Sequence, residues 1–198
     1  MESMGSFNVQ NNLESIDGNV PDDSLTVAFF DSGVGGLVFA VESIMKMREI
    51  SAGGQNSENL VKFLHIGDTK NVPYGLKSPS ELVEFSHNLV SVCKNFGARI
   101  VVVACNTAST VLSQEFIDFY KKQGISVLLI IKDSAKFLYQ NTNEVNGERH
   151  VAVLGTKQTV SSKKYYDEIL RLSQDEGKKT FVYQYSPIRL SLIHISEP

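Results

Sequence analysis

Cys105 is the residue whose type and position in this chain best suit proton-transfer chemistry. It follows the apolar string RIVVVA at residues 99–104, and Asn106, Thr107 and Ser109 come directly after it. At a junction between a strand and a helix, free backbone N–H groups and the helix dipole stabilise a thiolate. A lone cysteine is also commonly a small buried apolar residue, so the spacing alone leaves both interpretations open.

Two more polar segments follow predicted strands. The first is DSGVGG at residues 31–36, which is neither a dinucleotide motif nor a P-loop, because its glycine and lysine spacing differs from both. A tight turn is the alternative interpretation, but Asp31 could accept a proton or hold an ammonium group. The second is GDTKNVPYG at residues 67–75, where the backbone N–H groups of Tyr74 and Gly75 could bind a carboxylate, although an ordinary loop also fits.

The remaining reactive side chains predict no further site. His65, His87, His150 and His194 have no metal-ligand spacing, so we interpret them as structural or exposed and predict no metal. Cys93 lies near the end of a predicted helix that runs antiparallel to the strand before Cys105. We therefore expect Cys93 in the core, on the order of 15–20 Å from Cys105.

Apolar runs alternate with amphipathic stretches along the chain. Strands are predicted at residues 25–30, 60–66, 99–104, 127–131, 151–154 and 181–185. Helices are predicted at residues 37–50, 79–96, 105–120, 134–141 and 161–172, with a polar loop at 143–149. On the first helix, one face is expected to carry Leu37, Val41, Ile44 and Met45.

This order predicts an α/β fold of mainly parallel sheets flanked by helices. The site of such a sheet lies at the carboxyl ends of its strands. The segments at residues 31–36, 67–75, 105–109 and 155–159 each follow a strand, so we expect them to gather at one edge.

Composition narrows the class of protein. The 198 residues are 42% hydrophobic with a net charge of −3, which argues against a nucleic-acid or anionic-membrane partner. Two cysteines make no disulfide framework, so we expect a reducing, cytoplasmic setting. No apolar run approaches the ~20 residues that span a bilayer. Residues 1–24 are interpreted as a disordered leader, and residues 189–198 as a non-native tail.

Four motifs in order resemble the cofactor-independent aspartate/glutamate racemase family, and its glutamate-specific branch in particular. The matching strings are DSGVGG at 31–36, GDT and PYG within 67–75, ACNTAS at 104–109, and LGT at 154–156 with Thr159, Val160, Ser162 and Tyr165. The resemblance runs from about residue 25 to residue 187. The first string distinguishes this branch from the aspartate racemases.

The resemblance implies racemisation of glutamate by two thiols, without a cofactor, to supply D-glutamate for peptidoglycan. Cys105 would act on the D-glutamate face with help from Asp31. The residues implied in substrate binding are Ser32, Tyr74, Gly75, Asn106, Thr107 and Thr159. The implied fold has two similar domains, here at residues 25–131 and 132–188, with the second incomplete. A homodimer is also compatible with the family.

The sequence departs from the family in one important respect. The second catalytic cysteine of the family lies in a Gly-Cys-Thr-His string, and neither this string nor its assisting histidine and glutamate occurs in these residues. We therefore expect a C-terminally truncated, inactive fragment. Two alternatives stay open: a non-catalytic half-fold that binds a dicarboxylate or a partner, and a related racemase acting on aspartate or a hydantoin.

Overall fold

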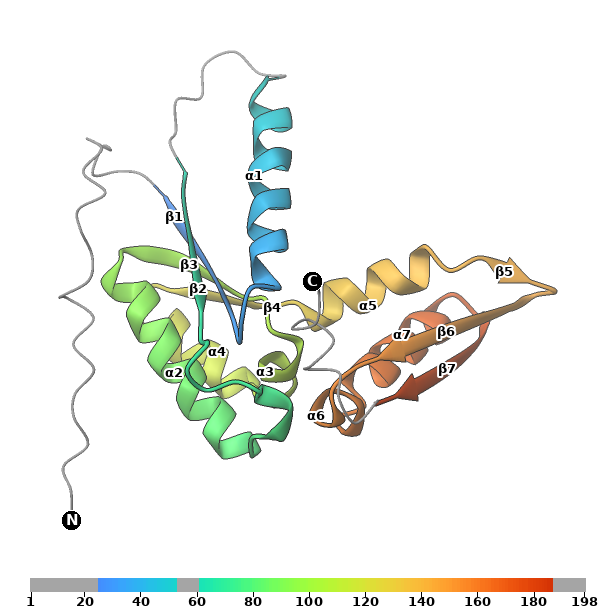
Figure 1. The fold of residues 1–198 in the computed structure, drawn as a ribbon. Helices are drawn as coiled ribbons and strands as arrows, with labels where there is room; N and C mark the ends of the chain where they lie inside the picture. Colours follow the sequence, from blue (N-terminus) through green and yellow to red (C-terminus); the bar gives the residue numbers. More distant parts are fainter. Residues whose placement is uncertain (1–24, 53–60, 187–198) are drawn as a thin grey trace, which may run out of the picture.

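Two β-sheets with helices packed against them make up residues 25–52 and 61–186, which are the residues described in the computed structural model (Figure 1). The first sheet is entirely parallel, in the order β2-β1-β3-β4. Its strands are β1 (Thr26–Asp31), β2 (Lys62–Gly67), β3 (Ala98–Val103) and β4 (Ser126–Leu129). The predicted α/β class is confirmed, whereas the predicted leader and tail lie outside the described residues.

The second sheet is smaller and has the order β5-β6-β7. Its strands are β5 (Glu144–Val145), β6 (Glu148–Leu154) and β7 (Lys179–Tyr185). β6 and β7 are parallel, whereas β5 and β6 pair antiparallel. We call the first sheet together with the helices up to residue 121 the first unit. The second sheet together with the helices from residue 131 onward is the second unit.

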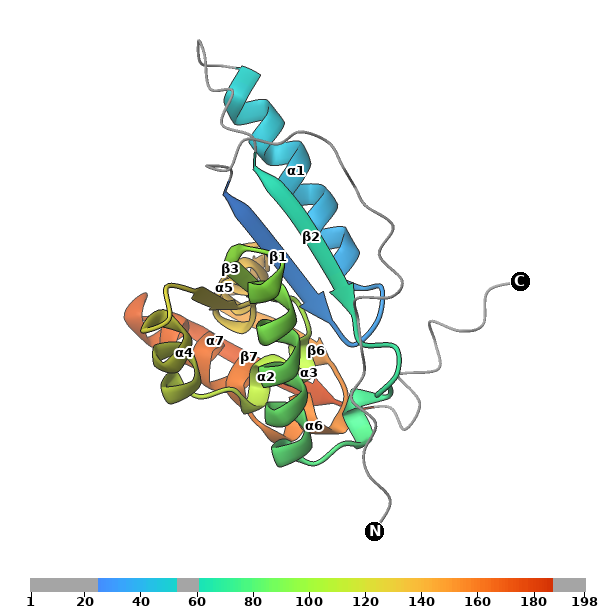
Figure 2. The same cartoon turned by 90° about the vertical axis from the view of Figure 1, so that its left-hand side faces the viewer.

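Helices cover both faces of the first sheet. α1 (Gly36–Ala52) lies along β1 and β2 on one face, and α2 (Pro79–Asn95) and α4 (Gln114–Lys121) pack on the other (Figures 1 and 2). The remaining helices are α3 (Asn106–Val111), α5 (Ile131–Gln140), α6 (Lys157–Ser161), α7 (Lys164–Asp175) and the 3-10 turn Tyr74–Leu76. Within the described ranges, no helix is long and apolar enough to cross a membrane.

Each unit has its own hydrophobic core. In the first unit, Phe30 of β1, Leu82 of α2 and Val101 of β3 are fully buried together. In the second unit, Tyr139 of α5 and Ile169 of α7 pack with valines of β6. Apolar residues on both faces of the central strands explain why these strands are covered by helices.

Two predicted helices are each broken in two. The helix predicted over residues 105–120 ends at Val111, because Leu112 and Ser113 adopt extended backbone conformations before α4 begins. The helix predicted over residues 161–172 is preceded by the separate short helix α6, and Lys163, with φ of 56°, turns the chain into α7. At the second break the Ser162 hydroxyl accepts from the Lys164 N–H at 3.3 Å, which favours a new helix start there.

The predicted loop at residues 143–149 is in fact a hairpin between β5 and β6. Asn146 and Gly147 occupy its turn with φ angles of 53° and 80°. Two consecutive positive φ angles are the requirement of a type I′ turn, and Asn-Gly is the pair that satisfies it most readily. The prediction of a loop was therefore wrong, although the sequence carried the signal.

The predicted apolar face of α1 is largely exposed. Leu37, Val41 and Met45 are 47%, 45% and 53% exposed, whereas Ala40 is buried against the sheet. A Cβ atom at Gly36 would lie 2.8 Å from Asp31 Cβ, so glycine lets the start of α1 approach the end of β1 closely, while larger apolar side chains of the helix stay uncovered.

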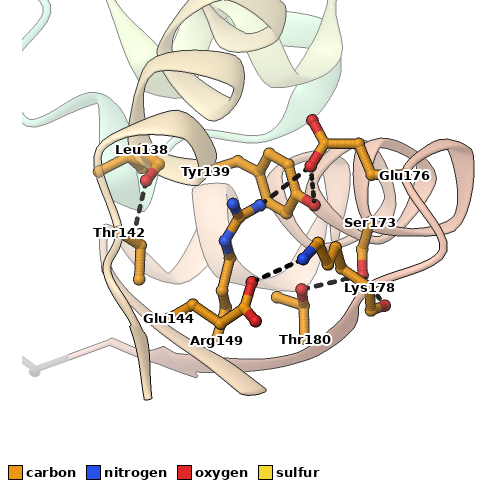
Figure 3. Close-up of polar contacts among 9 residues, drawn as sticks. All are labelled: Leu138, Tyr139, Thr142, Glu144, Arg149, Ser173, Glu176, Lys178 and Thr180. Carbon is orange, nitrogen blue, oxygen red and sulfur yellow. Dashed lines mark hydrogen bonds and ion pairs between the residues drawn. The ribbon is translucent and has the colours of Figure 1, made fainter. Parts of the chain in front are cut away.

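Polar contacts hold together the end of the second unit that carries the hairpin (Figure 3). The Arg149 guanidinium lies 4.4 Å from the Tyr139 ring centroid, and its Nη1 atom lies 3.2 Å from Glu176 Oε2. The Tyr139 hydroxyl donates to the same Glu176 oxygen at 3.0 Å. Lys178 and Glu144 form a second ion pair at 2.9 Å. These contacts join α5, the hairpin and the loop after α7.

We predict that Arg149→Met lowers the free energy of unfolding by about 1–2 kcal/mol, because it removes a cation–π contact and a charged hydrogen bond. Urea unfolding followed by circular dichroism measures the change. The matched control is Arg171→Met, since the Arg171 side chain is 56% exposed in its ion pairs with Glu168 and Asp175 and should have a smaller effect. Equal losses in the two variants would contradict this account.

Candidate functional site

The carboxyl ends of β1, β2 and β3 bring three polar loops together, as predicted. Asp31 is paired in register with Gly67, and the Ala104 N–H donates to the Phe30 carbonyl at 2.8 Å. The loops after β1 and β2 approach so closely that a Cβ atom at Gly67 would lie 2.5 Å from the Gly33 carbonyl oxygen. Glycine at residue 67 is therefore required for this approach.

Asp31 is buried at the start of the first loop, with its carboxylate turned back toward that loop. One oxygen accepts from the Ser32 N–H at 2.7 Å and from the Ser32 hydroxyl at 3.4 Å. The other accepts from the Gly36 N–H at 2.9 Å, at the first residue of α1. Asp31 thus fixes the loop and places a negative charge beside the site.

Cys105 occupies the N-cap position of α3, and only 4% of its surface is exposed. Its Sγ atom lies 3.7 Å from the Ser32 hydroxyl oxygen, to which it donates. Burial raises the pKa of the thiol to about 11, and the nearby charge of Asp31 contributes in the same direction. Hydrogen bonds from Ala108 and Ser32 oppose this rise without cancelling it. In this structure the thiol is therefore protonated at neutral pH.

Residues of the second unit complete the site from the other side. The Thr107 hydroxyl lies 3.0 Å from the Thr156 hydroxyl and 3.4 Å from the Thr159 hydroxyl. The Tyr165 hydroxyl donates to Asn106 Oδ1 at 2.6 Å. The fourth predicted segment, at residues 155–159, thus reaches the other three from a different sheet, which the prediction of one shared edge did not include.

The loop after β2 is fixed by Asp68. Its carboxylate accepts from the Tyr74 hydroxyl at 2.7 Å and from the Asn71 side-chain amide at 2.8 and 3.0 Å. Burial and Asp68 together raise the pKa of Tyr74 well above its usual value. Gly75 lies directly against the second unit, because a Cβ atom there would be 2.9 Å from Thr156 Cβ.

Every residue predicted for the site lies on one of these loops or on the short helices α3 and α6. Cys105, Asp31, Thr107, Thr159 and Tyr74 are buried, whereas Asn106 is exposed. The residues predicted for the site did not include Thr156, Tyr165 and Asp68, although all three belong to strings that carry the family resemblance. The available signal was a polar side chain directly after a glycine for Thr156 and Asp68, whereas Tyr165 has no such neighbour. The described residues contain no cluster of three or more His, Cys, Asp or Glu side chains that could hold a metal.

Known proteins similar to this chain are glutamate racemases. No protein-family model matches. The glutamate racemase of Chlorobium phaeobacteroides is 34% identical over 150 residues, which cover 74% of this chain and 47% of that protein. The glutamate racemase of Streptococcus agalactiae is 32% identical over 151 residues, covering 76% and 50%. The chain thus spans about half the length of the curated relatives it matches.

Solved structures that are similar to this chain also include glutamate racemases. Glutamate racemase isoform RacE1 of Bacillus anthracis superposes with a TM-score of 0.64 and 28% identity, over 86% of this chain and 56% of that one. The Escherichia coli glutamate racemase, solved with L-glutamate and the activator UDP-MurNAc-ala, gives a TM-score of 0.57 and 27% identity, over 84% and 55%. Over the residues that match, this chain is similar in sequence and in fold to about half of a glutamate racemase.

Proposed function

We propose that this chain forms one face of a glutamate racemase site, in which Cys105 exchanges a proton with the α-carbon of D-glutamate. The observation that carries the proposal is the position of Cys105, buried where three strand-end loops of the first unit meet α6 and α7 of the second. The similarity to racemases, one of them solved with L-glutamate, supports glutamate as the substrate.

The polar groups around Cys105 suit the two carboxylates and the ammonium group of glutamate. Asp31 supplies a negative charge, which can hold the ammonium group or accept a proton. The Nδ2 group of Asn106 has no hydrogen-bond partner among the described residues and can donate to a carboxylate. The proposed substrate-binding residues are Ser32, Tyr74, Gly75, Asn106, Thr107 and Thr159.

The proposed reaction starts from the Cys105 thiolate. The thiolate takes the α-proton of D-glutamate and becomes a thiol, and the electron pair of the C–H bond stays on the substrate as a carbanion. Return of a proton to the same face regenerates D-glutamate, whereas inversion needs a proton from the opposite face. Cys93, the other cysteine of the printed sequence, is fully buried in the first core and cannot reach the substrate. Cys93 therefore cannot supply the proton that inversion needs.

Formation of the thiolate is the difficult step, because burial and Asp31 both raise the pKa of Cys105. A bound ammonium group would supply a positive charge beside Asp31 and the thiol. An opposite charge within about 4–6 Å favours an ionised group, so substrate binding itself would lower the pKa of Cys105. The reaction then needs no pyridoxal phosphate or other cofactor.

The wider role that we propose is the supply of D-glutamate for peptidoglycan in the cytoplasm. The two free cysteines in the described residues are compatible with a reducing compartment. A homodimer is the proposed assembly, and light scattering measures it directly.

A non-catalytic role is the second candidate, because burial raises the pKa of the Cys105 thiol and Cys93 cannot act as its counterpart. In that case the site would bind a dicarboxylate such as glutamate without exchanging its α-hydrogen. Calorimetric binding without proton exchange would support this alternative, and it is therefore one outcome of the experiment below.

We predict that the 198-residue chain exchanges the α-hydrogen of D-glutamate in D2O without producing L-glutamate, because one thiol serves one face only. Proton NMR follows the loss of the α-hydrogen signal, and chiral chromatography detects inversion. Cys105→Ala should reduce exchange by about 100-fold or more, which is the usual contribution of a general base.

Cys93→Ala is the matched control and should retain exchange, since Cys93 lies in the core away from the loops. Absence of exchange in the unsubstituted chain would contradict the proposed function. Inversion of D-glutamate by the 198 residues alone would contradict the proposal that the chain serves one face of the substrate only.

A second prediction concerns the pH dependence of the thiol. Only the thiolate reacts with iodoacetamide, so alkylation of Cys105 should be slow at pH 7 and should rise with pH toward about 11. Asp31→Asn removes a negative charge that raises the pKa of Cys105, so the inflection should move to lower pH. Mass spectrometry of the labelled peptide measures both profiles. An inflection at or above that of the unsubstituted chain would show that Asp31 does not act on the thiol.

A further inference from the structure

Lys164 makes a contact between the two units that the proposed chemistry does not use. It is the first residue of α7 in the second unit, and its side chain reaches α3 in the first. Its Nζ atom donates to the Leu112 carbonyl at 3.1 Å and to the Ser109 carbonyl at 3.3 Å. Both carbonyls lie at the C-terminal end of α3, whose N-terminal end carries Cys105.

The end of α3 is a place where a cation is stabilising. The helix has only six residues, and the extended conformation of Leu112 ends it. The last carbonyls of a helix lack partners within it and carry a partial negative charge. The Lys164 ammonium satisfies two such carbonyls at once.

The surroundings of Lys164 set it apart from a solvated surface lysine. It has no carboxylate partner among residues 25–52 and 61–186, so its contacts with α3 are the ones that compensate its partial burial. Burial lowers the pKa of Lys164 below its usual value. An ammonium group held under these conditions depends on the carbonyls that it contacts.

The next residue, Tyr165, holds the opposite end of the same helix. Its hydroxyl donates to Asn106 Oδ1, so consecutive residues of α7 contact both ends of α3. The left-handed conformation of Lys163 directs the chain into α7 at this point. With a contact at each end, a helix this short has little freedom to shift as a rigid body.

We propose that Lys164 is a positioning residue, which fixes α3 against the second unit and thereby keeps Cys105 buried and oriented in the site. The part of this inference that concerns proton exchange by Cys105 rests on the proposed function. Its effect on the burial of Cys105 can be measured whether or not the protein acts on glutamate.

The test compares Lys164→Met, which keeps the length of the side chain but removes its charge and donors, with Lys164→Arg. Lys136→Met, an exposed substitution on α5, is the control. The measurement is the alkylation rate of Cys105 and of Cys93 at pH 8, each followed on its own peptide. Cys93 reports general loosening, because it is fully buried in the core of the first unit.

Lys164→Met should increase alkylation of Cys105 about tenfold, which corresponds to a tenfold larger fraction of accessible thiolate. Cys93 should stay as slow as in the unsubstituted chain, and Lys164→Arg should restore slow labelling of Cys105. Hydrogen exchange of the amides in residues 106–112 should become faster in Lys164→Met alone.

Three outcomes would overturn the proposal. These are an unchanged Cys105 rate in Lys164→Met, a parallel increase at Cys93, and the same increase in Lys136→Met. Exchange of the D-glutamate α-hydrogen separates this proposal from the proposed function. If the unsubstituted chain shows no exchange, the function fails while the labelling result still decides the role of Lys164.

Discussion

The contact between α3 and the second unit is the constraint on which the candidate site depends. The Thr107 hydroxyl contacts the Thr156 and Thr159 hydroxyls, and Asn106 accepts a hydrogen bond from Tyr165. Both residues that follow Cys105 are therefore held by side chains of the second unit. Buried hydroxyl groups are stable only when they are hydrogen-bonded, which makes the contacts of Thr107 with the second unit specific. Cys105 itself is buried in the core of the first unit, next to the α3 residues that make these contacts, and its raised pKa follows from that burial.

This arrangement places the Asp31 carboxylate beside the Cys105 thiol, and no lysine or arginine among the described residues forms an ion pair with Asp31. Asp31 fixes the loop before α1 through hydrogen bonds from Ser32 and Gly36, while its charge disfavours ionisation of Cys105. Because Asp31 disfavours the Cys105 thiolate, the site is suited to a substrate that carries a positive charge and thereby favours the thiolate. An α-amino acid has such a charge next to the carbon that must lose its proton. The electrostatics of the site and the chemistry of the proposed substrate therefore agree.

Much of this architecture could be predicted from the sequence, because apolar strings and the polar segments after them are local signals. The strand before Cys105 and the loops at Asp31 and Gly67 were located in this way. The helix breaks at Leu112 and Lys163 were missed, since apolar periodicity continues across them and only tertiary contacts decide where the helix ends. The Asn146-Gly147 hairpin was missed although its signal is local.

Contacts between units could not be predicted, because they depend on how two sheets meet. No pattern within α7 indicates that Lys164 and Tyr165 reach opposite ends of α3. The exposure of Leu37, Val41 and Met45 on α1 could not be predicted either. A periodic apolar face shows that a helix is amphipathic, but it does not show which part of the protein covers that face. The domain boundary between residues 131 and 132 stays a prediction, because two cores in contact do not show that either folds alone.

The central claim is that Cys105 serves one face of a glutamate molecule bound between the two units. A crystal structure of the chain with D-glutamate tests it most directly. We predict that the α-hydrogen of the ligand points at Cys105 Sγ and that one of its carboxylates lies against Asn106. A ligand bound away from Cys105, or one whose α-hydrogen points to the opposite side, would contradict the account.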